Sequence, residues 1–197
     1  TRPSESALAS DALSLIVSIL GVKAVPDLLD AVDSPSAAVR GSALELATGL
    51  GLEDVTARWT RTAAASGPEV RAAIVEMLGR RGDSSALAYV RECLHDGDRI
   101  VRLAAIPASA KLGGETVLTD LFGLLSTSDA DEAAALRTRL LMFKAGDVVP
   151  EAAGRIAATS GPGKAVLIDI LGEKGARGEI GRVFALAADA DPSIRAA

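Results

Sequence analysis

Cys93 and His95 are the only cysteine and the only histidine in the chain, and they lie two residues apart. These residue types bind metal ions and form nucleophile–base pairs. A zinc site needs three or four such ligands, and two residues apart on a helix point in different directions. Any Ser-His-Asp or Cys-His arrangement would depend on His95 alone. We therefore predict no catalytic residue, no metal site and no cofactor, and a single cysteine excludes an intrachain disulfide.

The run Gly161-Pro162-Gly163-Lys164 superficially resembles a phosphate-binding loop. A Walker motif has a different spacing and follows a β-strand, and no segment here alternates with the period of two that indicates strands. We predict that this run is a turn between two helices.

An internal repeat with a period of 31 organises the chain. Three Val-Arg pairs follow one another at this period, and an Ile-Arg pair lies three periods after the third: Val39-Arg40, Val70-Arg71, Val101-Arg102 and Ile194-Arg195. Between them, Ala133 and Lys164 occupy the arginine position. A period of this length is typical of helical repeat proteins, in which stacked helix pairs share one core. The repeat predicts six helix pairs over about residues 6–190, and the start of a seventh at Asp191.

Each repeat has two segments with apolar residues at i, i+3 and i+7, which is the pattern of an amphipathic helix. Glycines follow the first segment at Gly51, Gly82, Gly113 and Gly175, with Gly146 two places late in the fifth repeat. Glycine is the favoured residue just past a helix, so we predict that these residues end the first helices. Trp59 shares its repeat position with Leu28, Val90 and Leu121, and we predict that it is buried.

The chain resembles HEAT-like repeats of the phycobilisome-lyase type. The resemblance is carried by the segment Asp191-Pro192-Ser193-Ile194-Arg195-Ala196-Ala197 and by the Val-Arg helices with their following second helices. It implies an all-α fold, a right-handed α-α superhelix, in one HEAT-like domain over residues 1–197. The partial seventh repeat leads us to expect a segment of a longer array.

HEAT-like repeats also imply a ladder in which an Asp six residues before each Arg bonds to a neighbouring repeat. Asp96 and Asp189 match this pattern. The ladder is interrupted elsewhere, because the equivalent positions hold Ser34, Ala65, Thr127 and Ala158.

Composition and charge limit the classes of molecule that we expect as partners. The 197 residues carry a net charge of -5, and only 3% are aromatic. Nucleic-acid binding needs clustered Lys and Arg, so we predict no nucleic-acid partner. The longest apolar run, Leu13–Val22, is too short to span a bilayer, so we predict no membrane partner. We expect a soluble monomer, cytoplasmic or periplasmic.

The solvent side of the second helices is the candidate binding surface, and such solenoids use it as a concave face. Its residues are Asp27, Asp30, Arg58, Arg61, Tyr89, Glu92, Asp120, Glu151 and Arg182. One interpretation is a set of exposed ion pairs between repeats, each contributing about 0–1 kcal/mol. The other is a mixed-charge groove for a protein or peptide, with Tyr89 as an anchor.

Three functions are compatible with this resemblance. The first is a protein-interaction scaffold without catalysis, and the second is a structural spacer within a larger multidomain bacterial protein. The third is a HEAT-like enzyme such as a lyase or a DNA glycosylase. Iron-binding hydroxylases of this fold use paired His-Glu motifs, which one histidine cannot supply. We favour the scaffold.

The fifth repeat departs most from the pattern. Glu132 and Ala133 replace its Val-Arg pair, and Arg139 occupies an otherwise largely apolar position. The sixth repeat then begins with two glycines, which favours a poorly held helix start. We predict a hinge near residues 126–133 or 158–164.

Overall fold

The computed structural model describes residues 4–51, 55–179 and 181, and within these ranges the chain forms α-helices and short 3₁₀-helices with no strand. The predicted all-α architecture of paired, HEAT-like helices is confirmed. The helices group into two compact units, residues 1–112 and 113–197, which are described in turn. The prediction of one continuous domain stays a prediction.

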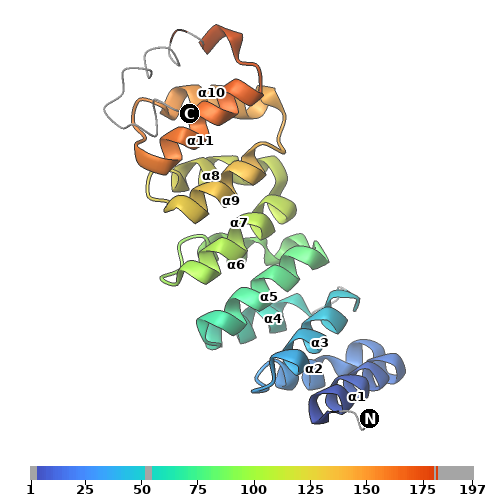
Figure 1. Cartoon of the computed structure of the whole chain (residues 1–197). Helices are drawn as coiled ribbons and strands as arrows, with labels where there is room; N and C mark the ends of the chain where they lie inside the picture. Colours follow the sequence, from blue (N-terminus) through green and yellow to red (C-terminus); the bar gives the residue numbers. More distant parts are fainter. Residues whose placement is uncertain (1–3, 52–54, 180, 182–197) are drawn as a thin grey trace. The chain divides into compact units, whose positions relative to one another are not determined.

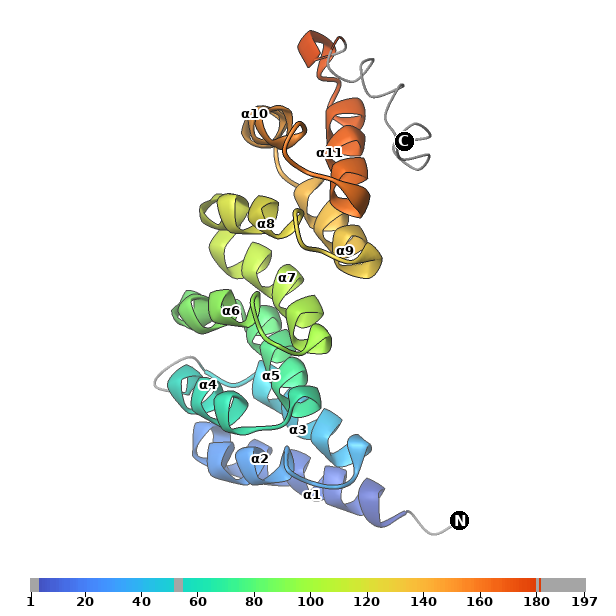
Figure 2. The same ribbon diagram turned by 90° about the vertical axis from the view of Figure 1, so that its left-hand side faces the viewer.

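The first unit contains three helix pairs and the first helix of a fourth (Figure 1). Its first helices are α1 (Glu5–Leu20), α3 (Ala37–Thr48), α5 (Pro68–Arg81) and α7 (Arg99–Gly113). Its second helices are α2 (Val25–Ala31), α4 (Thr56–Ala65) and α6 (Leu87–Cys93), and 3₁₀ turns at Gly21–Ala24 and Ser84–Ala86 precede α2 and α6. In this unit α3 packs on both α1 and α2, and α5 packs on α3 and α4, so the first helices form one layer and the second helices another (Figure 2).

The second unit continues the pattern. A 3₁₀ turn at Gly114–Val117 leads into α8 (Leu118–Leu124), followed by α9 (Ala130–Leu140), α10 (Ala145–Arg155), α11 (Gly161–Glu173) and a 3₁₀ turn at Arg177–Glu179. Here α11 packs on α9 and α10. The predicted second helix of repeat six and the start of repeat seven lie outside the described residues.

The sequence period is visible in the helix boundaries. The second helices α2, α4, α6 and α8 begin at Val25, Thr56, Leu87 and Leu118, each one full period after the last. The fifth repeat differs, because α10 begins at Ala145. Gly146 therefore lies in the first turn of α10, and the prediction that it ends the preceding helix was wrong.

One repeat position on the second helices is completely buried in both units, and we call it the second-helix column. Its members lie one period apart: Leu28, Trp59, Val90, Leu121 and Ala152. The predicted burial of Trp59 is confirmed. Because the neighbouring repeats hold smaller side chains at this position, Trp59 buries the most apolar surface of the five.

The glycines stop helices less regularly than predicted. Gly82 does end α5 in the left-handed conformation, with φ of 76°, and Gly175 lies just past α11 with φ of 66°. Gly113, however, remains within α7, and Gly114 adopts the positive φ instead. Helix α3 ends at Thr48, and Gly49 just past it has an ordinary negative φ; this residue lies two positions before the predicted Gly51. Where two glycines lie next to or near each other, the sequence does not determine which of them lies at the end of the helix.

Gly163 has a packing role that its sequence position did not suggest. A Cβ atom added to this residue would lie 1.8 Å from the carbonyl oxygen of Leu125. The first turn of α11 therefore rests directly against the backbone that ends α8. The run Gly161–Lys164 is the first turn of α11, so the prediction that it forms a turn between two helices was wrong. Gly163 allows the close approach between the two backbones.

The fifth repeat begins with a well-capped helix. The Asp129 carboxylate accepts hydrogen bonds from the backbone N–H groups of Asp131 and Glu132, and Glu132 accepts one from Asp129 in return. This capping box satisfies groups at the start of α9 that would otherwise lack partners. Further along α9, Arg137 pairs with Asp169 at 2.6 Å and with Glu173, both from α11.

Candidate interaction surface

The repeated arginine of the first helices has a structural role. Arg40 donates hydrogen bonds to the carbonyl oxygens of Ser34 and Pro35, at 2.8 and 3.1 Å. Arg102 does the same to Asp96 and Gly97, at 2.9 and 3.1 Å. In each case the guanidinium caps the turn between a second helix and the next first helix. Arg40 and Arg102 therefore hold the turns that lead into α3 and α7.

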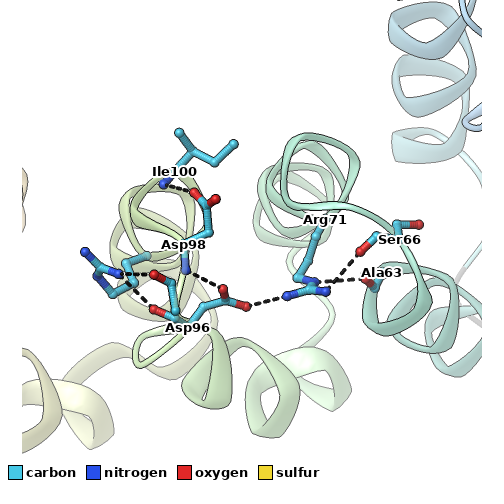
Figure 3. Close-up of polar contacts among 8 residues, drawn as sticks. Ala63, Ser66, Arg71, Asp96, Asp98 and Ile100 are labelled. Carbon is cyan, nitrogen blue, oxygen red and sulfur yellow. Dashed lines mark hydrogen bonds and ion pairs between the residues drawn. The ribbon is translucent and has the colours of Figure 1, made fainter.

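Arg71 also forms the predicted link between repeats. Its guanidinium donates to the carbonyls of Ala63 and Ser66, and Nη1 reaches Asp96 of the following repeat at 2.7 Å (Figure 3). Asp96 also accepts a hydrogen bond from the backbone N–H of Asp98 at 2.8 Å. The predicted hydrogen bond between an Arg and the Asp of a neighbouring repeat is confirmed at Asp96, and we call it the Arg71–Asp96 rung. Asp189 lies outside the described residues.

The pKa values of this rung follow from its geometry. The N–H of Asp98 and the guanidinium of Arg71 hold the pKa of the Asp96 carboxyl below its ordinary value, against the opposing effect of burial. The same hydrogen bond raises the pKa of Arg71. Both groups are therefore charged at neutral pH, and the rung is a charge-assisted bond between neighbouring repeats.

Basic residues at the ends of first helices form a second set of links that the sequence analysis missed. Arg81 donates to the carbonyls of Ala47 and Gly51, at the end of α3 and just beyond it. Lys174, which occupies the same repeat position, donates to the Leu141 carbonyl at 2.6 Å. Unpaired carbonyls and the helix dipole both favour a cation at a helix C-terminus. The signal in the sequence was that the basic residue Arg81 is followed three periods later by Lys174, at the same repeat position.

Five charged side chains of the candidate surface lie exposed in the first unit. Asp27 and Asp30 are one turn apart on α2, Arg58 and Arg61 are one turn apart on α4, and Glu92 is on α6. Within residues 4–51 and 55–112, none of these five forms an ion pair. The predicted ion pairs among Asp27, Asp30, Arg58, Arg61 and Glu92 are thus not formed, so their charges face solvent. We refer to these five residues as the charged face.

Tyr89 does not extend into solvent as an anchor would. Its hydroxyl oxygen is buried, and the residue as a whole is half-buried. Burial raises the pKa of the Tyr89 phenol, and the neighbouring thiol of Cys93 raises it further, with Arg71 and Asp96 also nearby. Tyr89 therefore packs beside the Arg71–Asp96 rung.

The remaining candidates belong to the second unit. Glu151 accepts a hydrogen bond from Nε of Arg155 at 2.9 Å on the same helix, and the Arg155 guanidinium lies 5.9 Å from the centre of the Phe122 ring. Asp120 is half-buried. Arg182 lies outside the described residues. Glu151 is therefore engaged within the fold.

The two potentially reactive side chains, Cys93 and His95, differ in exposure. Cys93 is buried, and burial raises the pKa of its thiol, which disfavours the reactive thiolate. His95 is exposed. Across the described ranges, no three His, Cys, Asp or Glu side chains are grouped as a metal site requires.

A shallow apolar depression of about 200 Å³ lies between α3 and α5. Val32, Leu44 and Val70 contribute to its lining, and Gly41 leaves room because it has no side chain. The sequence analysis did not identify it, because the space depends on how two helices approach each other.

The N-terminal helical stretch Glu5–Ala31 is long and apolar enough to cross a membrane by length and composition, with a mean hydropathy of 1.8. The apolar run Leu13–Val22, on which the prediction of no membrane partner was based, is only part of this longer stretch. The stretch is interrupted at Gly21, whose φ of 55° and ψ of -129° are not helical. Helix α1 alone has 16 residues, fewer than the roughly 20 that a spanning helix needs.

Residues 57–140 match the family model for HEAT repeats. The match covers 84 of the 197 residues, so it shows HEAT repeats for this segment of the chain. The matched HEAT repeats run from α4 to the end of α9 and include the Arg71–Asp96 rung. No curated protein matches the sequence.

Proposed function

We propose that this HEAT-like chain is a non-catalytic scaffold that binds a segment of another protein across the charged face. The observation that supports this is that Asp27, Asp30, Arg58, Arg61 and Glu92 carry full charges to solvent with no ion pair to one another. In the same unit, Arg71 is paired within the fold. Charges left free in a regular array are available to a partner, and HEAT-like repeats commonly mediate protein–protein interactions.

The order of the charges suggests the partner's chemistry. The face is acidic on α2, basic on α4 and acidic again at Glu92 on α6. Packed helices lie about 8–10 Å apart, and an extended chain advances about 3.3 Å per residue. A complementary extended segment therefore carries basic, acidic and basic residues at intervals of about three positions. Such complementarity chiefly increases the association rate and the specificity, and it weakens with salt.

Capture experiments with charge-reversed proteins test this function. Wild-type protein and the variant Asp27→Lys/Asp30→Lys are used as baits in an extract of the source cells, and bound proteins are identified by mass spectrometry. Glu45→Lys/Glu76→Lys is the matched control, because it changes the net charge equally at exposed positions on the first helices α3 and α5.

The scaffold proposal expects a salt-sensitive set of captured proteins that is lost with Asp27→Lys/Asp30→Lys and retained by the control. Arg58→Glu/Arg61→Glu should abolish the same captures. If both reversals retain every protein that the wild type captures, the charged face binds nothing, and a structural spacer becomes the better interpretation.

A further inference from the structure

The apolar depression between α3 and α5 also has two charged residues in its lining. Arg40 comes from α3 and Glu69 from α5, so a cation and an anion stand on the two helices that bound the space. Arg40 is half-buried and Glu69 is exposed. Within the described residues, neither side chain forms an ion pair, with the other or with a third residue. We call this site the α3–α5 depression.

The α3–α5 depression is formed by residues that the repeat does not keep. Gly41 holds the position of Ala72 and Leu103 in the next two repeats, and a Cβ atom added to Gly41 would meet nothing within 4 Å. Glu69 holds the position of Ile100. One period later, apolar side chains therefore replace both the glycine and the carboxylate. The combination of open space, cation and anion belongs to this pair of helices and is not a consequence of the repeat.

Arg40 lacks the carboxylate partner of its counterpart Arg71. Nη1 of Arg40 makes both of its hydrogen bonds, to turn carbonyls, whereas Nε and Nη2 donate none within the described residues. Arg71 donates from all three nitrogens, and one of them reaches Asp96. The position of Asp96 in the preceding repeat is held by Ala65, whose methyl group cannot accept a hydrogen bond. A half-buried guanidinium with two unused nitrogens is a binding group for a carboxylate.

The size of the depression indicates an occupant of one side chain. Pockets that hold small molecules usually measure about 300–1,000 Å³ and cover most of the ligand. The α3–α5 depression is shallow and measures about 200 Å³, which accommodates a single apolar side chain. Anchors of this kind supply much of the binding energy at protein interfaces. The charges in the lining then favour an acidic group beside Arg40 and a basic group beside Glu69.

We propose that the α3–α5 depression binds a segment of another protein in which a leucine-sized side chain lies between an acidic and a basic residue. The apolar side chain fills the space beside Gly41. The acidic group accepts hydrogen bonds from Nε and Nη2 of Arg40, and the basic group pairs with Glu69. This site lies on the first helices α3 and α5, so it does not rest on the charged face, which lies on the second helices.

A titration of the isotope-labelled 197-residue protein with the peptide acetyl-Asp-Leu-Lys-amide, followed by amide NMR spectra, tests the site. Saturable shifts should be largest over residues 37–44 and 67–73. The dissociation constant should be on the order of 1 mM, because the peptide buries one side chain and forms two partly exposed ion pairs. An absence of saturable shifts in these two ranges overturns the proposal.

Two further peptides separate the apolar and the charged contributions. Acetyl-Asp-Ser-Lys-amide lacks the apolar group, and acetyl-Lys-Leu-Lys-amide lacks the carboxylate. Each should bind at least about five-fold more weakly than acetyl-Asp-Leu-Lys-amide. Equal binding of either peptide shows that the corresponding contact does not form, and it overturns the proposal.

The substitution Gly41→Leu tests the depression itself. It adds a side chain to the lining and should weaken binding of acetyl-Asp-Leu-Lys-amide at least about ten-fold. The variant should fold, because a Cβ at Gly41 meets nothing and leucine is a better helix former than glycine. Gly172→Leu on α11 is the matched control, because Gly172 is also exposed with open space around its Cβ, and it should bind like the wild type. Unweakened binding by Gly41→Leu, or equal weakening by Gly172→Leu, contradicts the assignment.

The substitution Ala65→Asp tests the role of Arg40 without removing the arginine. It places a carboxylate at the position from which Asp96 reaches Arg71. This carboxylate should occupy the unused donors of Arg40 and weaken peptide binding at least about three-fold. Ala65→Asn has a similar shape without the charge, and it should leave the affinity unchanged. If Ala65→Asp binds the peptide as tightly as the wild type does, Arg40 does not hold the acidic group and the proposal fails.

A free amino acid is the competing ligand, because its carboxylate and ammonium groups carry the same two charges as the flanking residues of the peptide. Free leucine is therefore titrated under the same conditions. Binding weaker than that of acetyl-Asp-Leu-Lys-amide supports a protein segment as the occupant. Shifts over the same residues with equal or higher affinity identify an amino-acid site and overturn the proposal.

Discussion

The Arg71–Asp96 rung makes a specific prediction for the substitution Asp96→Asn. One carboxylate oxygen accepts the Asp98 N–H, and the other accepts Nη1 of Arg71. An asparagine keeps the first bond through its carbonyl oxygen. It places an NH₂ group where Arg71 also presents a donor, so the second bond is lost. Arg71 keeps its bonds to Ala63 and Ser66.

The expected cost follows from the exposure of the pair. A hydrogen bond to a charged group contributes about 1.5–3 kcal/mol, and exposed ion pairs contribute about 0–1 kcal/mol. The side chains of Arg71 and Asp96 are 25% and 14% exposed, which places the rung between these limits. We expect Asp96→Asn to lower the free energy of unfolding by about 1–2 kcal/mol at pH 7.

The pH dependence has a defined sign. Because the pKa of Asp96 is lower in the folded protein than its ordinary value of 3.8, its stabilisation is complete above pH 3.8. That stabilisation is lost as the pH falls through the folded-state pKa. The difference between wild type and variant should therefore be full at neutral pH and decrease only below pH 3.8.

Urea unfolding followed by circular dichroism measures the difference in the free energy of unfolding between wild type and Asp96→Asn. The comparison requires that the slope of this free energy against urea concentration is the same for both proteins. Asp98→Asn is the control, because Asp98 accepts the Ile100 N–H at the start of α7 and asparagine is an equally good cap. If Asp96→Asn costs no more than Asp98→Asn, the rung contributes nothing and the reasoning fails.

Three further predictions concern packing and stability. Trp59→Ala should cost about 3–5 kcal/mol in urea unfolding, because it leaves a cavity at a fully buried position; native emission typical of a water-exposed indole would contradict the burial. Gly163→Ala should destabilise by about 1–3 kcal/mol because its Cβ meets a backbone carbonyl, whereas Gly172→Ala on the same helix should be neutral or stabilising. Hydrogen exchange should be faster over Glu132–Ile170 than over Val70–Leu112, and equal protection of the two ranges would exclude a hinge near residues 126–133 or 158–164.

The elements that the sequence predicted well are those set by local periodicity. The second-helix column with Trp59 and the starts of α4, α6 and α8 follow directly from apolar spacing and from the repeat period. The Arg71–Asp96 rung was predictable from the resemblance to HEAT-like repeats, because the pattern requires only an Asp six residues before the repeated Arg. These features repeat, so each repeat supports the assignment of the others.

The features that were missed depend on how two helices meet. The caps made by Arg81 and Lys174 join residues from different repeats, and only the structure shows which carbonyls they reach. Gly146 was misassigned because α10 starts four residues before its in-phase position. The capping box at Asp129 and Glu132 is visible in the sequence as an Asp-x-x-Glu pattern. It was missed because Glu132 was interpreted only as a departure from the Val-Arg pairs of the other repeats.

The candidate surface was predictable in position but not in detail. Helical spacing correctly placed Asp27, Asp30, Arg58, Arg61 and Glu92 on the solvent side of their helices. It did not show that their charges are unpaired, since side chains at neighbouring repeat positions can meet or diverge. Nor did it show that the hydroxyl of Tyr89 is buried.

The contact between Gly163 and Leu125 limits how far the repeats are interchangeable. Gly163 occupies the repeat position held by Val39, Val70 and Val101, so averaging the repeats into a consensus would place valine there. In the sixth repeat that side chain would overlap the Leu125 carbonyl. An idealised array designed from this chain would therefore have to keep this repeat as it is or redesign the end of α8 with it, and natural recombination between repeats would meet the same barrier.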